Sequence, residues 1–277
     1  MKVSPECYEC LAKLACDAAI LASGEKTVQE RARSAALGIL EREFTPDVVS
    51  VDLATKIHDV IKEISQNQDP YRRLKDDEIE IAGRLFAQVN PLYQNGFIDK
   101  LKLAVFGNSI DFFRPVELID ASLKADFAVD ESEKLLKKLK SAGSVLYLAD
   151  NAGEAYFDIP LYKYMGLYTD ITYVVKSHPV QNDITEYDLA FAGLMDTGIK
   201  LLKTGTASPG IIMSQASTEF LRAFEEADLV FAKGMGYYES LHELPHKGKV
   251  FHCLKAKCKP VAQSIGVPLD SFVAMFL

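Results

Sequence analysis

The spacing of apolar residues along the chain changes near residue 130. Up to about residue 95, apolar residues recur every three or four positions, which is the pattern of one buried face of an α-helix. Four helices are predicted in this part, at residues 6–22, from about 27, at 49–64 and at 76–89. The first part of the chain is therefore expected to be all helical.

After residue 130, helical patterns alternate with short runs of apolar residues. Such uninterrupted runs are typical of parallel strands that are buried on both faces of a sheet. Five strands are predicted, at residues 145–149, 171–175, 199–202, 229–231 and 250–253. Because helices separate the strands, they are expected to form a doubly wound, mainly parallel sheet.

This change of pattern divides the chain into three parts. Residues 1–95 are predicted to form a helical domain, and residues 130–277 are predicted to form an α/β catalytic domain. Residues 96–129 are predicted to be a connecting segment that packs on both. The expected fold class is α/β, with a helical N-terminal region before a five-stranded sheet.

Polar residues and glycines follow the predicted strands, at the edge where doubly wound sheets bind ligands. The first four strands are followed, in order, by Asp150, Asn151 and Glu154; by Asp183; by Gly205 and Ser208; and by Lys233 and Gly234. With the strand order 3-2-1-4-5, the first and fourth strands flank the point where the sheet reverses direction. Asp150 and Asn151 are then expected beside Lys233, with Asp183 one strand away.

The residue types at this edge indicate phosphoryl chemistry. The carboxylates of Asp150 and Asp183 and the amide oxygen of Asn151 form a set of hard oxygen ligands that suits Mg²⁺ or Mn²⁺. Lys233 would pair with phosphate as a point charge, and glycine-rich loops would present backbone N–H groups to it. Together these features predict metal-dependent phosphoester hydrolysis. The competing interpretation is that the same residues are helix caps, turn residues and a solvated lysine.

The composition argues against some classes of binding partner, namely nucleic acids and membranes. The 277 residues carry a net charge of −8, which argues against binding to the anionic backbone of nucleic acid. No run reaches the roughly 18 apolar residues of a membrane span. The N-terminal sequence lacks the apolar core of a signal peptide, so a cytoplasmic protein is expected.

The five cysteines do not predict a disulfide framework, because their number is odd and the expected compartment is reducing. Cys7 and Cys10 have the spacing of a soft-metal or redox pair, although a buried core pair on the first helix explains them equally well. Cys258 would complete a soft-metal site if the C-terminal region packs on the first helix.

Several short motifs resemble the damage-control phosphatase family, whose shared unit is called an acidic-residue-methyltransferase-like metal-binding domain. The motifs at the strand ends are Asp150-Asn-Ala-Gly-Glu154, Asn182-Asp-Ile-Thr185 and Lys233-Gly-Met-Gly-Tyr-Tyr-Glu239. Others resemble the prokaryotic stand-alone branch: Cys7-Tyr-Glu-Cys10, Asp69-Pro-Tyr71, Gly107-Asn-Ser-Ile-Asp111 and Leu254-Lys-Ala-Lys-Cys258. The resemblance covers nearly the whole chain, and the ordered set of motifs is specific.

This resemblance implies a Rossmann-like sheet domain and a phosphatase that requires a divalent metal such as Mg²⁺, Mn²⁺, Co²⁺ or Ni²⁺. Its substrate would be a small phosphorylated metabolite, such as a sugar phosphate or a damaged cofactor precursor. The family's metal ligands correspond to Asp150, Asn151 and Asp183, and its lysine corresponds to Lys233.

We expect Lys233 to act in catalysis by neutralising the transferring phosphoryl group. Glu154 or Asp183 is the expected general base. The residues expected to contact the substrate are Asn108, Asp111, Gly205, Ser208 and Gly234.

Two other functions compete with the phosphatase. An S-adenosylmethionine-dependent carboxyl methyltransferase would share the α/β fold, but it favours a glycine-rich loop after the first strand. Here that loop is crowded with oxygen acceptors, from Asp150 to Glu154. The other alternative is a non-catalytic metabolite-binding protein.

Overall fold

The computed structural model describes residues 1–109, 125–245 and 248–277, and it has an α/β fold with a helical N-terminal region. The helices are α1 Pro5–Ala22, α2 Lys26–Glu43, α3 Ser50–Ser65, α4 Arg72–Val89, α5 Gly96–Gly107, α6 Ser132–Leu139, α7 Ala155–Met165, α8 Glu186–Phe191, α9 Thr218–Glu226, α10 Gly234–Leu241 and α11 Lys259–Ile265. The strands are β1 Phe127–Asp130, β2 Ser144–Leu148, β3 Asp170–Val175, β4 Leu201–Lys203, β5 Leu229–Lys233, β6 Val250–Lys255 and β7 Phe272–Phe276. A short 3₁₀-helix, η3 Ala152–Glu154, precedes α7.

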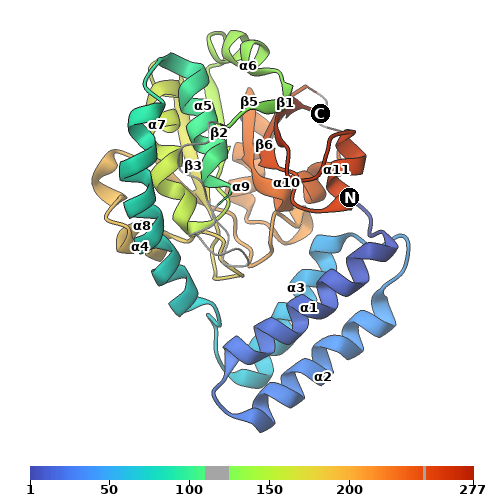
Figure 1. Ribbon diagram of the computed structural model, residues 1–277. Helices are drawn as coiled ribbons and strands as arrows, with labels where there is room; N and C mark the ends of the chain where they lie inside the picture. The colour runs from blue at the N-terminus through green and yellow to red at the C-terminus, as the bar shows by residue number, and fades with distance from the viewer. Residues whose placement is uncertain (110–124, 246–247) are drawn as a thin grey trace.

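The strands form one mixed sheet in the order β1-β7-β6-β5-β2-β3-β4 (Figure 1). The five predicted strands are β2 to β6, and their predicted parallel pairing is confirmed. They have the order 3-2-1-4-5 on which the expected placement of the site residues depended. The predicted count of five strands is wrong, because β1 and β7 extend the sheet beyond β6. β1 has only four residues and no fully buried side chain, so it lacks a buried apolar run, whereas β7 follows α11 but pairs antiparallel with β6.

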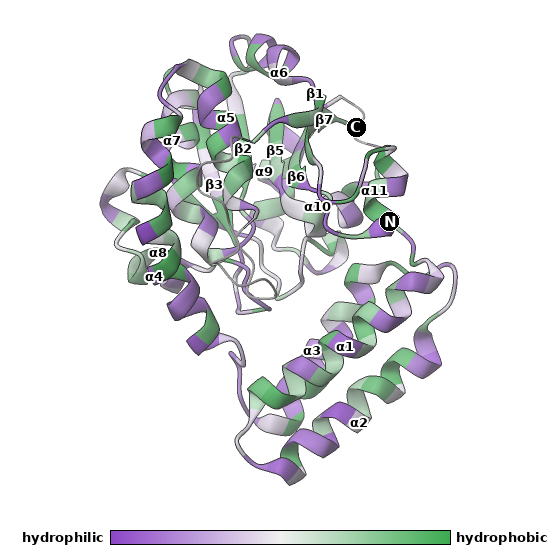
Figure 2. Cartoon of the chain, viewed as in Figure 1, coloured by the Kyte–Doolittle hydropathy of each residue, from purple (hydrophilic) through white to green (hydrophobic). Residues whose placement is uncertain are grey.

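The central strands are buried on both faces. Val145 and Tyr147 of β2 point into one core with α5 and α7, whereas Leu146 and Leu148 point into a second core with α9 and α10. Figure 2 shows hydrophobic residues concentrated in these strands and polar residues on the outer helices. The uninterrupted apolar run of β2 is explained by this two-sided burial.

Helices α1, α2 and α3 form a layer with a hydrophobic core of its own, which includes Leu14, Leu40 and Ile57. This layer lies beside one edge of the sheet, where α1 approaches α11 and α3 approaches α10 (Figure 1). Helix α4 packs against η3, α7 and α8 of the α/β part. The division of the chain at residues 95 and 130 stays a prediction. Within the described residues, no helix is long and apolar enough to cross a membrane.

A buried ionic network connects α4 to α8. The Asp188 carboxylate accepts hydrogen bonds from the backbone N–H and the hydroxyl of Thr185, which begins α8, at 2.8 and 2.6 Å. Its oxygens also lie 2.6 Å from the Arg72 guanidinium and 3.5 Å from the Lys75 ammonium. Asp188 and Lys75 are fully buried, so each supplies the other with a compensating charge.

Replacing Asp188 with alanine is expected to lower the free energy of unfolding by about 3–5 kcal/mol, because buried cationic and N–H groups lose their acceptor. Urea denaturation followed by circular dichroism measures the change. Asp76→Ala is the matched control, since Asp76 contacts the same arginine at 2.7 Å from a more exposed position. It is expected to cost about 1 kcal/mol or less. An equal loss of unfolding free energy in the two variants would contradict the expectation that the burial of Asp188 makes its contacts important.

Candidate active site

The loops after β2 and β3 are joined by backbone hydrogen bonds at the carboxyl edge of the sheet. The Ile184 N–H donates to the Asp150 carbonyl and the Ala152 N–H donates to the Asn182 carbonyl, both at 2.8 Å. These bonds form an isolated antiparallel bridge between Asn151 and Asp183, beyond the parallel pairing of β2 with β3. The side chains predicted as metal ligands are therefore brought together by the backbone.

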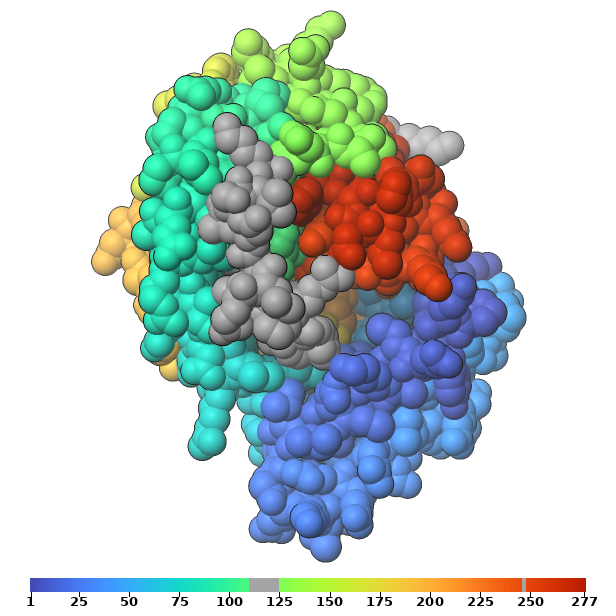
Figure 3. All heavy atoms as spheres, viewed as in Figure 1, coloured from blue at the N-terminus to red at the C-terminus, as the bar shows by residue number. Residues whose placement is uncertain are grey.

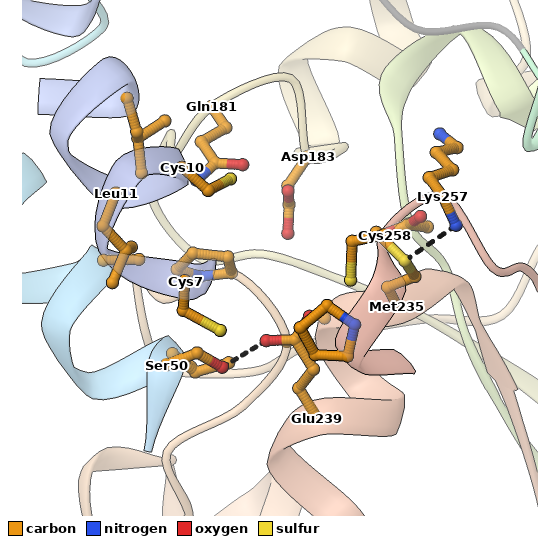
Figure 4. A pocket seen from close by; sticks show the side chains of 18 of the residues that line it. Cys7, Cys10, Leu11, Ser50, Gln181, Asp183, Met235, Glu239, Lys257 and Cys258 are labelled. Carbon is orange, nitrogen blue, oxygen red and sulfur yellow. Dashed lines mark hydrogen bonds between the residues drawn. The ribbon is translucent and has the colours of Figure 1, made fainter. Parts of the chain in front are cut away.

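A cavity of about 460 Å³ opens at this edge. Asp150, Asn151 and Asp183 line it from the sheet, and α1 and α3 line it from the opposite side. Figure 3 shows the face on which the N-terminal helices (blue) lie against the C-terminal segment (red). In the close-up of Figure 4, Asp183 points into the space between α1 and the start of α11. The cavity thus has one wall from each layer.

The three predicted ligands present oxygen atoms to this cavity. The Asn151 side-chain N–H group donates to Glu154 Oε1 at 2.8 Å, which leaves its amide oxygen available as a ligand. Asp183 Oδ2 accepts no hydrogen bond of normal geometry within the described residues, although the Lys176 ammonium lies 3.3 Å from it. The buried Asp183 carboxylate therefore depends on nearby positive charge.

Burial raises the pKa of Asp150 well above its usual range, and the charges of Glu154 and Asp183 raise it further. Burial also raises the pKa of Asp183, against the opposing effect of Lys176. A divalent cation would relieve the repulsion among these carboxylates, so the residues present fit such a cation. In the part of the chain that the structure describes, no three His, Cys, Asp or Glu side chains are arranged to hold an ion. Asn151, water and substrate would therefore complete the coordination.

Lys233 does not line the cavity, contrary to the expected contact with phosphate. It is fully buried, and its ammonium lies 2.7 Å from Glu154 and 2.6 Å from Asp158. It also donates to the Ala104 carbonyl at 2.8 Å. The sequence pattern gave no sign of Asp158, whose position four residues after Glu154 places both carboxylates toward the lysine.

Glu154 is likewise enclosed and does not line the cavity. Besides Lys233, its carboxylate accepts hydrogen bonds from the side-chain amides of Asn108 and Asn151, at 2.7 and 2.8 Å. This placement does not give the direct access to water that the expected general base requires. Glu154 and Lys233 instead lie behind the candidate ligands and fix their orientation.

Asn108 lines the cavity, as expected from the sequence. Its amide N–H groups donate to Asp150 at 3.0 Å and to Glu154, and its oxygen accepts the Lys255 N–H at 2.9 Å. Asn108 therefore holds Asp150 in place. Asp111, the other residue expected from the helical side, lies outside the described residues.

The glycine-rich loops approach the site differently from the expectation. Gly205 and Ser208 do not line the cavity, whereas Pro209 and Gly210 do. Gly205 packs against Ser217, and Ser208 is buried beside a threonine hydroxyl. The loop therefore reaches the cavity only after it has turned, which residue spacing alone does not indicate.

Gly234 also lies outside the cavity lining, but it is in close contact with Asp150. It has a positive φ of 74°, and an added Cβ atom would lie 1.8 Å from Asp150 Oδ2. The turn from β5 into α10 can pass this carboxylate only with glycine here.

Lys257, in the loop after β6, lines the cavity and was not selected from the sequence. Its positive charge lowers the pKa of Asp150, although less than burial raises it. Figure 4 shows it beside Cys258 at the edge of the cavity, with its backbone N–H donating to the Met235 sulfur. The available signal was its position after the fifth predicted strand, at the same edge of the sheet.

Cys7, Cys10 and Cys258 all line the cavity, because α1 packs against α11 (Figure 4). All three are free thiols. Burial raises the pKa of Cys258 to about 12 and also raises that of Cys10, so these thiols are neutral at pH 7. A soft-metal or redox role for the three stays a prediction.

Comparison with known proteins identifies relatives across the whole chain. The model of a family described as the damage-control phosphatase ARMT1-like domain matches residues 3–273. The damage-control phosphatase PH1575 of Pyrococcus horikoshii is 33% identical over 99% of this chain and 98% of its own length. The uncharacterized protein MJ0202 of Methanocaldococcus jannaschii is 36% identical over 99% of this chain and 95% of its own length.

A solved structure has the same fold. The crystal structure of a DUF89 family protein, PH1575 of Pyrococcus horikoshii, superposes with a TM-score of 0.90 at 30% identity. The match covers 100% of this chain and 99% of the other.

Gly234→Ala is expected to displace Asp150 and to weaken the binding of divalent cations, because the added methyl group overlaps the carboxylate. Backbone strain of about 1–3 kcal/mol is also expected. Gly193→Ala is the matched control, since Gly193 has a similar φ of 71° with nothing within 4 Å of an added Cβ. A cation titration followed by thermal unfolding compares the two. Unchanged cation binding in Gly234→Ala would contradict the close contact.

Proposed function

The chain belongs to the damage-control phosphatase ARMT1-like family, and we propose that it is a divalent-metal-dependent phosphatase of small phosphorylated metabolites. Sugar phosphates and damaged cofactor precursors are the proposed substrates. The observation that carries the proposal is the group of oxygen ligands from Asp150, Asn151 and Asp183 in one partly open cavity.

We propose that these three residues hold the metal ion. A divalent cation bound there would polarise the phosphoryl oxygens and lower the pKa of a coordinated water molecule. Asn151 is oriented for this role by its hydrogen bond to Glu154, and Asp150 by the hydrogen bond from Asn108. The ligands are thus held in position before a cation or substrate arrives.

Lys257 supports phosphate binding, because it brings a positive charge to the cavity lining close enough to affect Asp150. Gly210 and Gly236 also line the cavity, where their backbones pack closely against each other. We propose that Lys233 acts indirectly, through Glu154. Its buried ammonium contacts the Glu154 carboxylate and fixes its position, and Glu154 in turn orients Asn151.

Of the two carboxylates considered as general base, we favour Asp183. It lines the cavity, whereas Glu154 is enclosed by Lys233 and two amide groups.

The alternative methyltransferase is not favoured. The loop after β2 presents Asp150 and Asn151 to the cavity, where a cofactor-binding loop would present glycine backbone.

Phosphatase activity toward an aryl phosphate is expected to disappear after exhaustive chelation and to return with Mn²⁺, Mg²⁺, Co²⁺ or Ni²⁺. The physical reason is that the phosphoryl charge must be neutralised in a cavity that already contains buried carboxylates. Full activity in the chelated protein would contradict the mechanism. Absence of activity with every metal would favour the non-catalytic metabolite-binding alternative.

Asp150→Asn is expected to abolish activity and the rise in melting temperature that cation binding produces in the wild type. The raised pKa of Asp150 means that its ionised form destabilises the folded protein at pH values above the ordinary carboxyl pKa. Asparagine removes this charge but keeps an acceptor, so the metal-free melting temperature should be no lower than that of the wild type. Asp170→Asn, an exposed substitution at the start of β3, is the control. Normal turnover in Asp150→Asn would make Asp150 only a structural residue.

A further inference from the structure

Lys176, the residue after β3, is fully buried and does not line the cavity. Its backbone N–H donates to the Ile184 carbonyl at 2.9 Å, which fixes it beside the loop that carries Asp183. Its side chain runs inward, where a charged group requires acceptors in place of water.

The Lys176 ammonium contacts three separate elements. It lies 3.3 Å from Asp183 Oδ2, donates to the Gly210 carbonyl and is 4.1 Å from the centre of the Tyr237 ring in α10. Asp183 and Gly210 line the cavity, and α10 contributes Gly236 to it. One buried cation therefore connects the three segments that shape this end of the cavity.

We propose that Lys176 is a positioning residue that fixes the Asp183 carboxylate and the Gly210 loop for binding of the divalent cation. This inference rests on the proposed function. With Oδ2 held by the ammonium, Oδ1 is the oxygen left for a ligand in the cavity. Rotation of the carboxylate would leave a buried ammonium without its anionic partner, and this cost keeps the orientation fixed.

Positioning and simple charge neutralisation predict opposite results. If Lys176 acted only as a positive charge, its removal would tighten cation binding to the ionised Asp183 carboxylate, because one repulsive charge near a dication would be lost. The affinities are therefore compared at a pH above which binding no longer strengthens, so that protonation of Asp183, which Lys176 opposes, does not contribute. If Lys176 orients Asp183, its removal loosens a ligand and weakens binding. Loss of a residue that supports a metal ligand typically reduces metal affinity by about 10–100-fold.

The test is a Mn²⁺ titration of the full chain by calorimetry, in the absence of any phosphate ester. Lys176→Met keeps the length of the side chain without its charge, and we expect its Mn²⁺ affinity to fall by about 10–100-fold. Lys176→Gln, which keeps a donor for the Gly210 carbonyl, is the second variant if the methionine variant does not fold. The same fall in affinity is expected for it, because an amide does not replace the ion pair with Asp183.

Lys75→Met is the matched control. Lys75 is also fully buried in ion pairs, with Asp69 at 3.0 Å and Asp188 at 3.5 Å, and it lowers the pKa of Asp183 only from a distance. The control should lose stability but keep its Mn²⁺ affinity.

The outcomes separate this inference from the proposed function. If the wild type binds Mn²⁺ and Lys176→Met binds it equally or more tightly, Lys176 is only a counter-ion and the inference is overturned. If Lys75→Met weakens binding as much as Lys176→Met, direct contact with Asp183 is not the cause. If the wild type binds no divalent cation, the proposed function fails first and the inference falls with it.

Discussion

The site depends on one buried ammonium group, that of Lys233, between two buried carboxylates. Lys233 contacts Glu154 and Asp158, and its third hydrogen bond goes to the backbone of α5. Asp158 also accepts hydrogen bonds from the hydroxyls of Tyr147 and Tyr173, at 2.8 and 3.0 Å. This network joins β2, β3, β5, α5 and α7. Each charge in it has a charged or hydrogen-bonding partner, which is the condition under which charges remain in a protein interior.

The network also fixes the orientation of side chains that line the cavity. Because Glu154 is held from behind by Lys233, it can accept the amide donors of Asn151 and Asn108 from the front. The oxygen atoms of the candidate metal ligands then stay directed toward the cavity. Lys176 occupies a comparable place behind Asp183, so the candidate ligands are supported by a buried cation on each side. Placing several carboxylates close together is electrostatically unfavourable. The buried ammonium groups of Lys233 and Lys176 offset this free energy without contacting a ligand themselves.

Much of the fold was predictable from the sequence because burial on both sheet faces leaves uninterrupted apolar runs. These runs predicted the order of β2 to β6 and hence the convergence of Asp150, Asn151 and Asp183. β1 escaped prediction because this short edge strand has no fully buried residue, and β7 escaped it because this strand pairs antiparallel with β6.

The environment of individual side chains was less predictable. Whether a lysine at a strand end faces solvent, phosphate or a buried carboxylate depends on contacts between distant residues. Lys233 is enclosed, whereas Lys257 reaches the cavity, and both follow strands at the same edge. The meeting of Cys7 and Cys258 likewise depends on the packing of the first helix against the last one.

The two walls of the cavity belong to layers with separate hydrophobic cores. Among the described residues, the apolar side chains of Leu14 and Val51 on the helical wall form no hydrogen bond with the buried network behind Asp150. Substitutions there can reshape the space for the non-phosphate part of a substrate while the orientation of the oxygen ligands is preserved. This separation gives evolution a way to change selectivity by varying one layer, without rebuilding the chemistry that the other layer supports.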